Sequence, residues 1–426
     1  MIFDKIKNNS LATGAAVYLV SNILNASIPF ALLPILTRML TPEEYGEVAM
    51  FQTWIGALTA FVGLSLSGAA IRKYYDGDLA QDDLKEFIGT CFQILLVTAL
   101  VTFFAVYLFK ENLSTWLGLS QKWVLCGVLV AACSMLTQIR LGQWQAKKQA
   151  LKYGFLQVSQ SLFNVSLSLL FVVVLLQGAD GRISAQVWAA TIFAVGALLL
   201  LKRDNLLSFF HWRPQHVKEA LKFGVPLIPH VGGAYLLLSV DRFIINSKLG
   251  LAEVGIYMVA VQFGMAISLI FDAVNKAFVP WLFERLKRND AKQKQEIVKL
   301  TYAWYALILL GVGLAFIIGP WLITFIAGEK YTKAGDVFGW IALGQGFKGM
   351  YLMQTNYIFY SKRTKILSAI TIVAGVINVL CMIFLVGQHG LQGAAYSFSI
   401  GMGVLFLFTT IAANKAHSMP WLSFRV

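Results

Sequence analysis

Long apolar runs recur along the whole chain, and they constrain its fold more than any other feature. The first of them, "LATGAAVYLVSNILNASIPFALLPIL", covers residues 11–36. A helix of about 20 apolar residues is long enough to span the hydrocarbon core of a bilayer. Only 13% of the residues are charged, about half of the share that covers the surface of a soluble domain. The pattern indicates an integral membrane protein.

Apolar runs of this kind can be marked at twelve places. The connections between them are short, which favours a helical bundle, whereas the strands of a membrane barrel would alternate polar and apolar residues. The sequence therefore predicts an all-α polytopic membrane protein with twelve transmembrane helices. We place these helices at residues 11–36, 46–69, 87–109, 115–138, 155–177, 184–201, 220–247, 254–283, 299–327, 334–360, 365–386 and 391–413.

Lysine and arginine concentrate in one set of alternate connections. Because cytoplasmic loops carry the excess of positive charge, this bias predicts that both termini are cytoplasmic. The net charge of +14 is therefore mainly a topology signal. Nucleic acid is not an expected partner, since the basic residues are scattered instead of gathered on one face. We also expect no cleavable leader, because the first apolar run is too long for the core of a signal peptide.

A short internal similarity relates the two halves of the chain. "LTPEEYGEVAM" (40–50) aligns with "LGLAEVGIYMV" (249–259) through a leucine, a glutamate and a glycine at matching positions. Each stretch joins the first and second predicted helices of its half. We therefore predict an N-terminal lobe over residues 1–201 and a C-terminal lobe over residues 220–426. The basic segment 202–219 would be a cytoplasmic connection that lies partly as an amphipathic stretch on the membrane surface.

The stretch "FDAVNKAFVPWL" (271–282) places charged groups inside a predicted membrane helix. Asp272, Asn275 and Lys276 lie at positions i, i+3 and i+4, so they share one helix face. A charge near the bilayer centre costs about 2.5–3.5 kcal/mol on insertion scales. Two interpretations remain open: an internal bridge between Asp272 and Lys276, or a polar stripe that faces a cavity.

Lys348 lies near the middle of another predicted helix, within "GQGFKGM" (344–350). Its distance from the basic end of that helix makes it hard for the ammonium group to reach the membrane surface. Gln345 shares its face at position i−3. We expect both side chains to line a water-filled cavity, with a packed structural partner as the alternative for Lys348.

Paired prolines mark two of the predicted helices. Pro29 and Pro34 lie in the first helix, and Pro226 and Pro229 open the seventh, directly before His230 and a pair of glycines. Proline removes a backbone donor and kinks a helix. We therefore expect hinge-like breaks at both places. His230 either titrates near the membrane midplane or is a hydrogen-bonded structural group.

Several kinds of chemistry are missing from the sequence pattern. The chain has no glycine-rich phosphate loop of the type that ATPases carry. Its histidines and cysteines lack the spacing of metal ligands, and the predicted outer loops are too short to hold a catalytic site. We therefore expect a protein that is not an enzyme and that has no metal and no cofactor.

Two stretches resemble a known family. "LTRMLTPEEYGEVAMF" (36–51), and "FGVPLIPHVGGAYLLLSVDRFIINSKLGLAEVGIYMVAVQFG" (223–264) followed by "NKAFVPWL" (275–282), are similar to segments of Wzx-type O-antigen and polysaccharide flippases. These flippases are members of the multidrug, oligosaccharidyl-lipid and polysaccharide exporter superfamily. The resemblance extends over essentially the whole chain.

The resemblance implies a MATE-like, V-shaped pair of six-helix lobes around a central cationic cavity in the bacterial inner membrane. It implies alternating-access transport of an undecaprenyl-diphosphate oligosaccharide, with membrane lipid and a polysaccharide polymerase as partners and a proton or sodium gradient as the driving force. The residues expected to contact the anionic headgroup are Arg38, Arg72, Lys276 and Lys348. Those expected to line the cavity or to take part in ion coupling are His230, Asp272, Asn275 and Gln345.

Three other functions compete with this interpretation. A drug or cation antiporter of the same superfamily would need an acidic cavity, whereas the intramembrane charges here are net positive. A membrane polysaccharide polymerase or ligase would need a large outer loop. A lipid II flippase usually has two further helices. For Arg72 alone, the alternative is an ordinary positively charged anchor at the inner membrane surface.

Overall fold

The computed structural model describes residues 10–76, 81–208, 213–288, 290–363 and 365–421. Within these ranges the chain folds into α-helices with a few π and 3₁₀ segments, and no strand occurs among them. The chain divides into two compact units, Met1–Gly232 and Gly233–Val426, which we call the first and the second unit. The segment expected to connect the lobes, 202–219, lies within the first unit.

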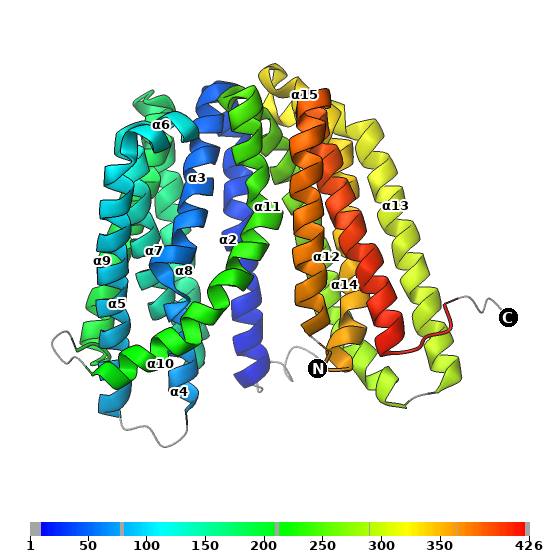
Figure 1. The fold of residues 1–426 in the computed structure, drawn as a ribbon, viewed down its shortest axis with the longest axis horizontal. Helices are drawn as coiled ribbons and strands as arrows, with labels where there is room; N and C mark the ends of the chain where they lie inside the picture. The colour runs from blue at the N-terminus through cyan, green and yellow to red at the C-terminus, as the bar shows by residue number, and fades with distance from the viewer. Residues whose placement is uncertain (1–9, 77–80, 209–212, 289, 364, 422–426) are drawn as a thin grey trace. The chain divides into compact units, whose positions relative to one another are not determined.

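The first unit is built mainly from helices that run up and down beside one another (Figure 1). Its elements are α2 (Ser10–Met39), α3 (Pro42–Gly63), α4 (Leu66–Tyr75), α5 (Gln81–Leu108), α6 (Lys110–Leu117), α7 (Gln121–Ala146), α8 (Ala150–Ser168), the π segment η1 (Leu169–Val174), α9 (Gly178–Arg203), α10 (Pro214–Gly224) and the 3₁₀ segment η2 (Val225–Leu227). Helix α11 (Ile228–Leu249) begins in the first unit and continues into the second.

The second unit contains fewer and longer helices. They are α12 (Leu251–Arg288), α13 (Ala291–Ala327), the 3₁₀ segment η3 (Glu329–Tyr331), α14 (Thr332–Tyr360) and α15 (Lys365–Ala416). Helix α15 consists of two helices that meet at Gly390, whose φ of 56° and ψ of −134° are not helical. The first turns of α3 and α12, at Pro42 and Leu251, are 209 residues apart, which is the offset of the internal similarity in the sequence.

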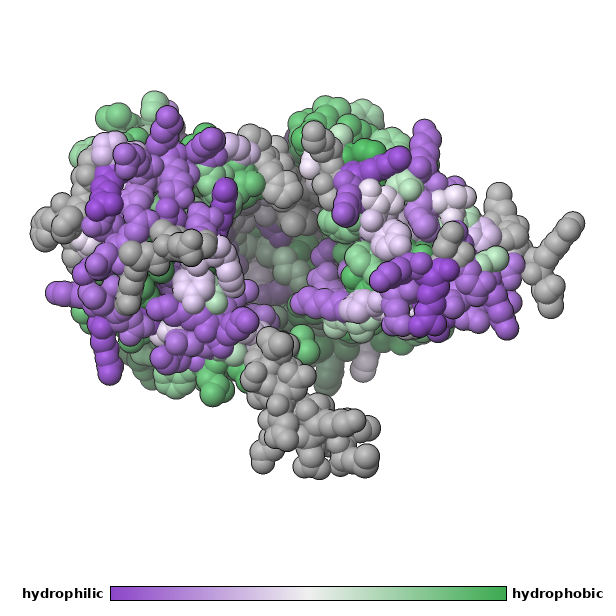
Figure 2. Space-filling model, turned by 90° about the horizontal axis from the view of Figure 1, so that it is seen from below, coloured by the Kyte–Doolittle hydropathy of each residue, from purple (hydrophilic) through white to green (hydrophobic). Residues whose placement is uncertain are grey.

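A helix lies within each of the twelve ranges that the sequence predicted. Eight helices of the described residues are long and apolar enough to cross a membrane by themselves, and the bent pair α3–α4 adds a ninth. Seen from below, hydrophilic side chains gather over the ends of the helices in each unit, while apolar side chains cover their sides (Figure 2). Polar ends and apolar sides are what a bilayer requires of a helical bundle.

The second predicted helix, 46–69, is interrupted in the structure. The structure breaks it at Leu64 and Ser65, whose φ angles of 42° and 53° are left-handed, and the two parts are bent by 50°. The break frees backbone carbonyls at the end of α3, and the Thr98 hydroxyl donates a hydrogen bond of 2.7 Å to one of them, the Val62 carbonyl. A side chain of α5 thus satisfies a group that the bend exposes.

Two further boundaries differ from the prediction. The fourth helix was expected to start at residue 115, but α7 starts at Gln121 because Gly118 ends α6 in the left-handed region with a φ of 66°. Breaks were expected at Pro29 and Pro34, yet α2 is continuous through both. A long apolar helix in a membrane has few alternative partners for its backbone, so losing single donors at proline is tolerated there.

Helix α10 packs against α4 and α5 at the lower end of the first unit (Figure 1). Its buried side chains, His216, Ala220 and Gly224, are four residues apart and form one stripe. The opposite face carries the exposed Lys218 and Lys222. This is the pattern of an amphipathic helix at a membrane surface.

Adding one methyl group at the contact of α10 with the α3–α4 break is expected to destabilise the first unit. A Cβ atom at Gly224 would lie 2.0 Å from the Leu64 carbonyl oxygen, so Gly224→Ala should lower the free energy of unfolding by about 1–3 kcal/mol. Gly196→Ala in α9 is the matched control, because a Cβ there meets nothing within 4 Å. It should raise stability by about 0.5–1 kcal/mol. Reversible unfolding in mixed micelles would measure both values, and equal effects would contradict this packing.

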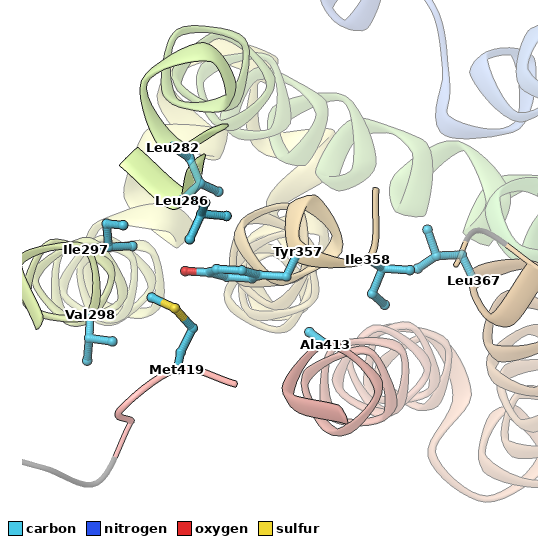
Figure 3. Packing of buried hydrophobic residues seen from close by; sticks show 9 residues of the cluster. All are labelled: Leu282, Leu286, Ile297, Val298, Tyr357, Ile358, Leu367, Ala413 and Met419. Carbon is cyan, nitrogen blue, oxygen red and sulfur yellow. The ribbon is translucent and has the colours of Figure 1, made fainter. Parts of the chain in front are cut away.

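The lower end of the second unit is held by a cluster of buried apolar side chains from four helices and from the segment after α15 (Figure 3). Leu282 and Leu286 of α12 pack with Tyr357 of α14 and with Met419, which follows α15. The Tyr302 hydroxyl of α13 donates a hydrogen bond of 2.9 Å to the Trp421 carbonyl. The segment after α15 therefore ties the ends of α13 and α14 together and fixes the positions of the helices above them.

Candidate functional site

The polar residues that the sequence singled out in the second unit come together between α12 and α14. The Lys348 ammonium of α14 donates a hydrogen bond of 2.5 Å to the Ser268 hydroxyl of α12. It also lies 3.9 Å from the Asp272 carboxylate, one turn further along α12. The Lys348 and Asp272 side chains are 30% and 40% exposed. The charge near the middle of α14 is thus held by two neighbours but stays accessible.

This geometry bears on the two interpretations of the 271–282 stretch. Among the described residues, Asp272 forms an ion pair with Lys348 and none with Lys276. Lys276 is exposed one turn below. Asp272 and Lys348 are thus the closest opposite charges of this polar stripe, and their partnership joins two helices instead of one.

Two amides extend the polar stripe in opposite directions. Towards the lower end, the Asn356 amide nitrogen donates a hydrogen bond of 2.8 Å to the Asn275 side-chain oxygen. In the other direction Gln345 is buried, and within the described part of the chain its side-chain oxygen has no hydrogen-bond partner. A buried amide oxygen without a partner is costly, so water or a bound molecule would be favoured beside it.

Small residues allow α12 and α14 to approach closely enough for these contacts. A Cβ at Gly349 would lie 2.7 Å from the Phe271 ring, and one at Gly264 would lie 2.6 Å from Ile341. Both glycines flank the polar stripe, one on each helix. Close packing of small residues is the usual way in which membrane helices associate, and here it sets the distance between Lys348 and its two partners.

The other expected headgroup ligands, Arg38 and Arg72, belong to the first unit and are exposed. Arg38 lies in the last turn of α2. The Arg72 guanidinium lies over the Phe223 ring at 5.6 Å from its centroid, so α10 covers one side of it. Arg38 and Arg72 do not form an ion-binding cluster with one another in the structure.

The proline-rich start of the seventh predicted helix spans two elements, η2 and α11. Pro226 lies in η2, the 3₁₀ turn between α10 and α11, so the helix is interrupted where a hinge was expected. The side chains of Pro229 and His230 lie outside the described residues.

Sequence reasoning missed a buried cation in the first unit. Arg140 falls just outside the predicted helix 115–138, but it lies inside α7 with only 1% of its surface exposed. Its guanidinium forms a salt bridge with Asp204, which follows α9, and it stacks on the Trp144 ring at 4.1 Å. The "RLGQW" spacing of Arg140 and Trp144 gives a local signal for the stacking, whereas Asp204 lies far away in the sequence.

Two further arginines are also buried. Arg182 of α9 donates hydrogen bonds of 2.7 Å to Asn164 and 2.9 Å to Ser168, at the point where α8 passes into η1. Arg242 of α11 pairs with the adjacent Asp241 at 3.1 Å. Buried charges in a membrane protein almost always have polar or charged partners. Arg182 links α9 to α8, and Arg242 also contacts the Met258 sulfur of α12 at 3.0 Å.

Comparison with known proteins gives relatives that match nearly the whole chain. An uncharacterized membrane protein of Haemophilus influenzae is 27% identical over 379 residues, which cover 86% of this chain and 88% of that protein. A putative O-antigen transporter of Shigella flexneri is 22% identical, with 89% of this chain and 93% of that protein covered.

The fold is shared with solved transporter structures. An inward closed structure of the lipid II flippase MurJ aligns with a TM-score of 0.75 at 15% identity and covers 94% of this chain and 87% of that one. An inward-facing multidrug resistance MATE transporter of the MOP superfamily aligns with a TM-score of 0.72 at 16% identity and covers 92% and 97%. These likenesses concern the fold alone, and they confirm the MATE-like architecture predicted from the sequence.

The family assignment rests on a match to most of the chain. Residues 11–286 match the family described as polysaccharide biosynthesis protein. This range covers all of the first unit's described helices and ends within the last turn of α12. It includes both stretches on which the resemblance to polysaccharide flippases was based, and that resemblance is confirmed. The chain is therefore a member of the polysaccharide biosynthesis protein family, within the fold group of the MATE transporters and MurJ.

Proposed function

We propose that this protein is a flippase of the bacterial inner membrane. Its substrate would be an undecaprenyl-diphosphate-linked repeat unit of O-antigen or a related polysaccharide. The two units would correspond to lobes that expose the substrate to the two leaflets in turn, driven by a proton or sodium gradient. The names of the relatives and the shared fold support a transport function for lipid-linked saccharides.

One observation carries the proposal for the substrate's headgroup: the accessible Lys348 ammonium between α12 and α14. A diphosphate needs cationic hydrogen-bond donors, and a lysine in the middle of a membrane helix is costly, so such a residue commonly marks a functional site. Among the described residues, Lys348 forms one ion pair, with Asp272 at 3.9 Å. An incoming diphosphate can therefore replace Asp272 as the counter-charge without leaving Lys348 unpaired.

The same pair supports a proposal for ion coupling. Protonation of Asp272 would remove the charge that faces Lys348 and would leave the ammonium free for the diphosphate. Deprotonation would restore the ion pair and favour release of the headgroup. Proton binding at Asp272 and headgroup binding at Lys348 would thus favour one another, because each relieves the other's need for the same ion pair.

A transport assay in proteoliposomes tests the flippase proposal directly. The vesicles would contain a fluorescently labelled undecaprenyl-diphosphate oligosaccharide, and exposure in the outer leaflet would be followed with and without a pH or sodium gradient. We expect the protein to move the labelled lipid and a gradient to accelerate it. Exchange of cationic dyes without movement of the lipid would contradict the proposal and would favour a drug or cation antiporter.

A further inference from the structure

A polar pocket lies at the upper end of the second unit, opposite the end that carries the C-terminus (Figure 1). Its volume is about 390 Å³, within the range of small-molecule sites. It is formed where three connections meet: the turn between α11 and α12, the start of α14 and the bend of α15. Its polar lining consists of Glu253, Lys333, Asp336, His389 and Gln392. The three other pockets described are lined almost wholly by apolar side chains.

The backbone at Gly390 creates this pocket. With a φ of 56° and a ψ of −134°, Gly390 adopts a conformation that L-residues with a side chain avoid. It separates the two helices of α15 and turns His389 and Gln392, which lie on either side of the bend, into the same pocket. The two polar side chains, three residues apart, thus line one pocket from the two sides of the bend.

The pocket combines hydrogen-bond acceptors and donors. The Lys333 ammonium lies 3.3 Å from the Glu253 carboxylate and fixes it at one side. The Asp336 carboxylate supplies a second acceptor, and it forms no ion pair among the described residues. The Tyr396 hydroxyl donates a hydrogen bond of 3.2 Å to the Gln392 side-chain oxygen, which leaves the Gln392 amide nitrogen to donate to a ligand.

His389 is the aromatic ring in the lining of the pocket, and two further rings behind it line a neighbouring pocket. Tyr396 packs against Trp340 with ring centroids 4.7 Å apart and against His389 at 5.8 Å. A sugar ring fits such a lining, because its hydroxyls pair with carboxylates and amides while a C–H face can pack on the His389 ring. A metal ion fits less well, since the described residues contain no group of three His, Cys, Asp or Glu side chains placed to ligate one.

We propose that this pocket binds one sugar residue of the glycan, a proposal that rests on the proposed flippase function. The carboxylates of Glu253 and Asp336 outnumber the single ammonium of Lys333, so these three groups give the pocket a net negative charge. It should therefore accept neutral and amino sugars and reject uronic acids. Its place at the end opposite the expected cytoplasmic face fits a site that receives the saccharide as the lipid-linked unit reaches the other leaflet.

Saturation-transfer NMR on the full-length protein in nanodiscs tests the pocket. The probes are N-acetylglucosamine, glucosamine and glucuronic acid, with Ca²⁺ titrated in a parallel sample. We expect transfer to the first two sugars but not to glucuronic acid. Asp336→Asn should weaken binding by about tenfold or more, because it removes a charged acceptor. Glu329→Gln is the matched control: Glu329 is exposed, lies at the start of η3 and does not line the pocket.

A second variant, Gln392→Ala, guards against a folding defect in the first, and both should keep the thermal transition of the wild type. Absence of transfer to all three sugars would overturn the proposal, as would equal binding by the Asp336→Asn and Glu329→Gln variants. Ca²⁺ binding that depends on Asp336, with no sugar bound, would replace it with a cation site. If sugars bind but the proteoliposome assay shows no transport, the pocket proposal stands and the flippase proposal fails. If the protein transports the lipid but binds no sugar in this pocket, the flippase proposal stands and the pocket proposal fails.

Discussion

Replacing Lys348 by alanine is expected to reduce transport of the lipid-linked oligosaccharide by roughly ten- to a hundredfold. The variant loses the ammonium that donates to Ser268 and faces Asp272. A hydrogen bond to a charged group contributes about 1.5–3 kcal/mol, and each 1.4 kcal/mol corresponds to about a factor of ten in binding. Initial rates in the proteoliposome assay, measured over a range of substrate concentrations, would show the loss.

Three further variants separate headgroup binding from other effects. Lys330→Ala removes an exposed charge on η3 and should transport like the wild type. Lys348→Arg keeps the charge and should retain part of the rate. Alanine at position 348 also leaves the Asp272 carboxylate unpaired, so the double variant Lys348→Ala/Asp272→Asn is needed. If the double variant regains the wild-type rate, Lys348 serves only to neutralise Asp272 and the proposed headgroup contact is wrong.

The second large effect is expected from Arg140→Ala, on stability instead of transport. Arg140 is almost wholly buried, forms a salt bridge with Asp204 and stacks on Trp144. Removing one partner of a buried ion pair usually costs about 3–5 kcal/mol. Because the Asp204 side chain is 35% exposed, solvent screens part of this loss, and we expect the free energy of unfolding to fall by about 2–3 kcal/mol.

Equilibrium unfolding in mixed micelles, with hydrogen exchange to locate the change in the first unit, would measure the effect. Arg203→Ala is the control, since Arg203 is exposed at the end of α9 and should change stability by less than about 0.5 kcal/mol. The pair Arg140→Met/Asp204→Asn should recover much of the loss, because removing both charges leaves none unpaired. A single Arg140→Ala variant as stable as the Arg203→Ala control would show that the salt bridge contributes nothing.

The sequence was most informative where local properties decide the structure. A run such as 87–109 can only be a helix in a bilayer, because no other segment is there to satisfy its backbone, and α5 covers it. The shared start of α3 and α12 follows from the same kind of local signal. In α3, Thr41 and Glu44 form reciprocal hydrogen bonds that cap the helix, with Pro42 in its first turn, and this "TPEE" pattern can be recognised in the sequence.

The sequence was least informative where helices meet. The α3–α4 break at Leu64 and Ser65 contains neither proline nor glycine, and it is held by Thr98 from α5 and by the close approach of Gly224 from α10. Arg140 fell outside the predicted helix 115–138. Its burial could not be predicted, because its partner Asp204 lies beyond the next two helices. These features depend on contacts between distant segments, which hydropathy and helical periodicity do not encode.

In the candidate site, some features could be predicted from the sequence and others depend on how the helices pack. By itself, the sequence determined that Asp272, Asn275, Gln345 and Lys348 are polar groups inside apolar helices, because composition and helical spacing suffice for that. The tertiary structure decided that Lys348 pairs with Asp272 and Ser268, and that polar side chains of α12, α14 and α15 meet in one pocket beside Gly390. Pairing depends on which helices lie side by side and at what distance, and small residues such as Gly264 and Gly349 set that distance only once the helices have packed.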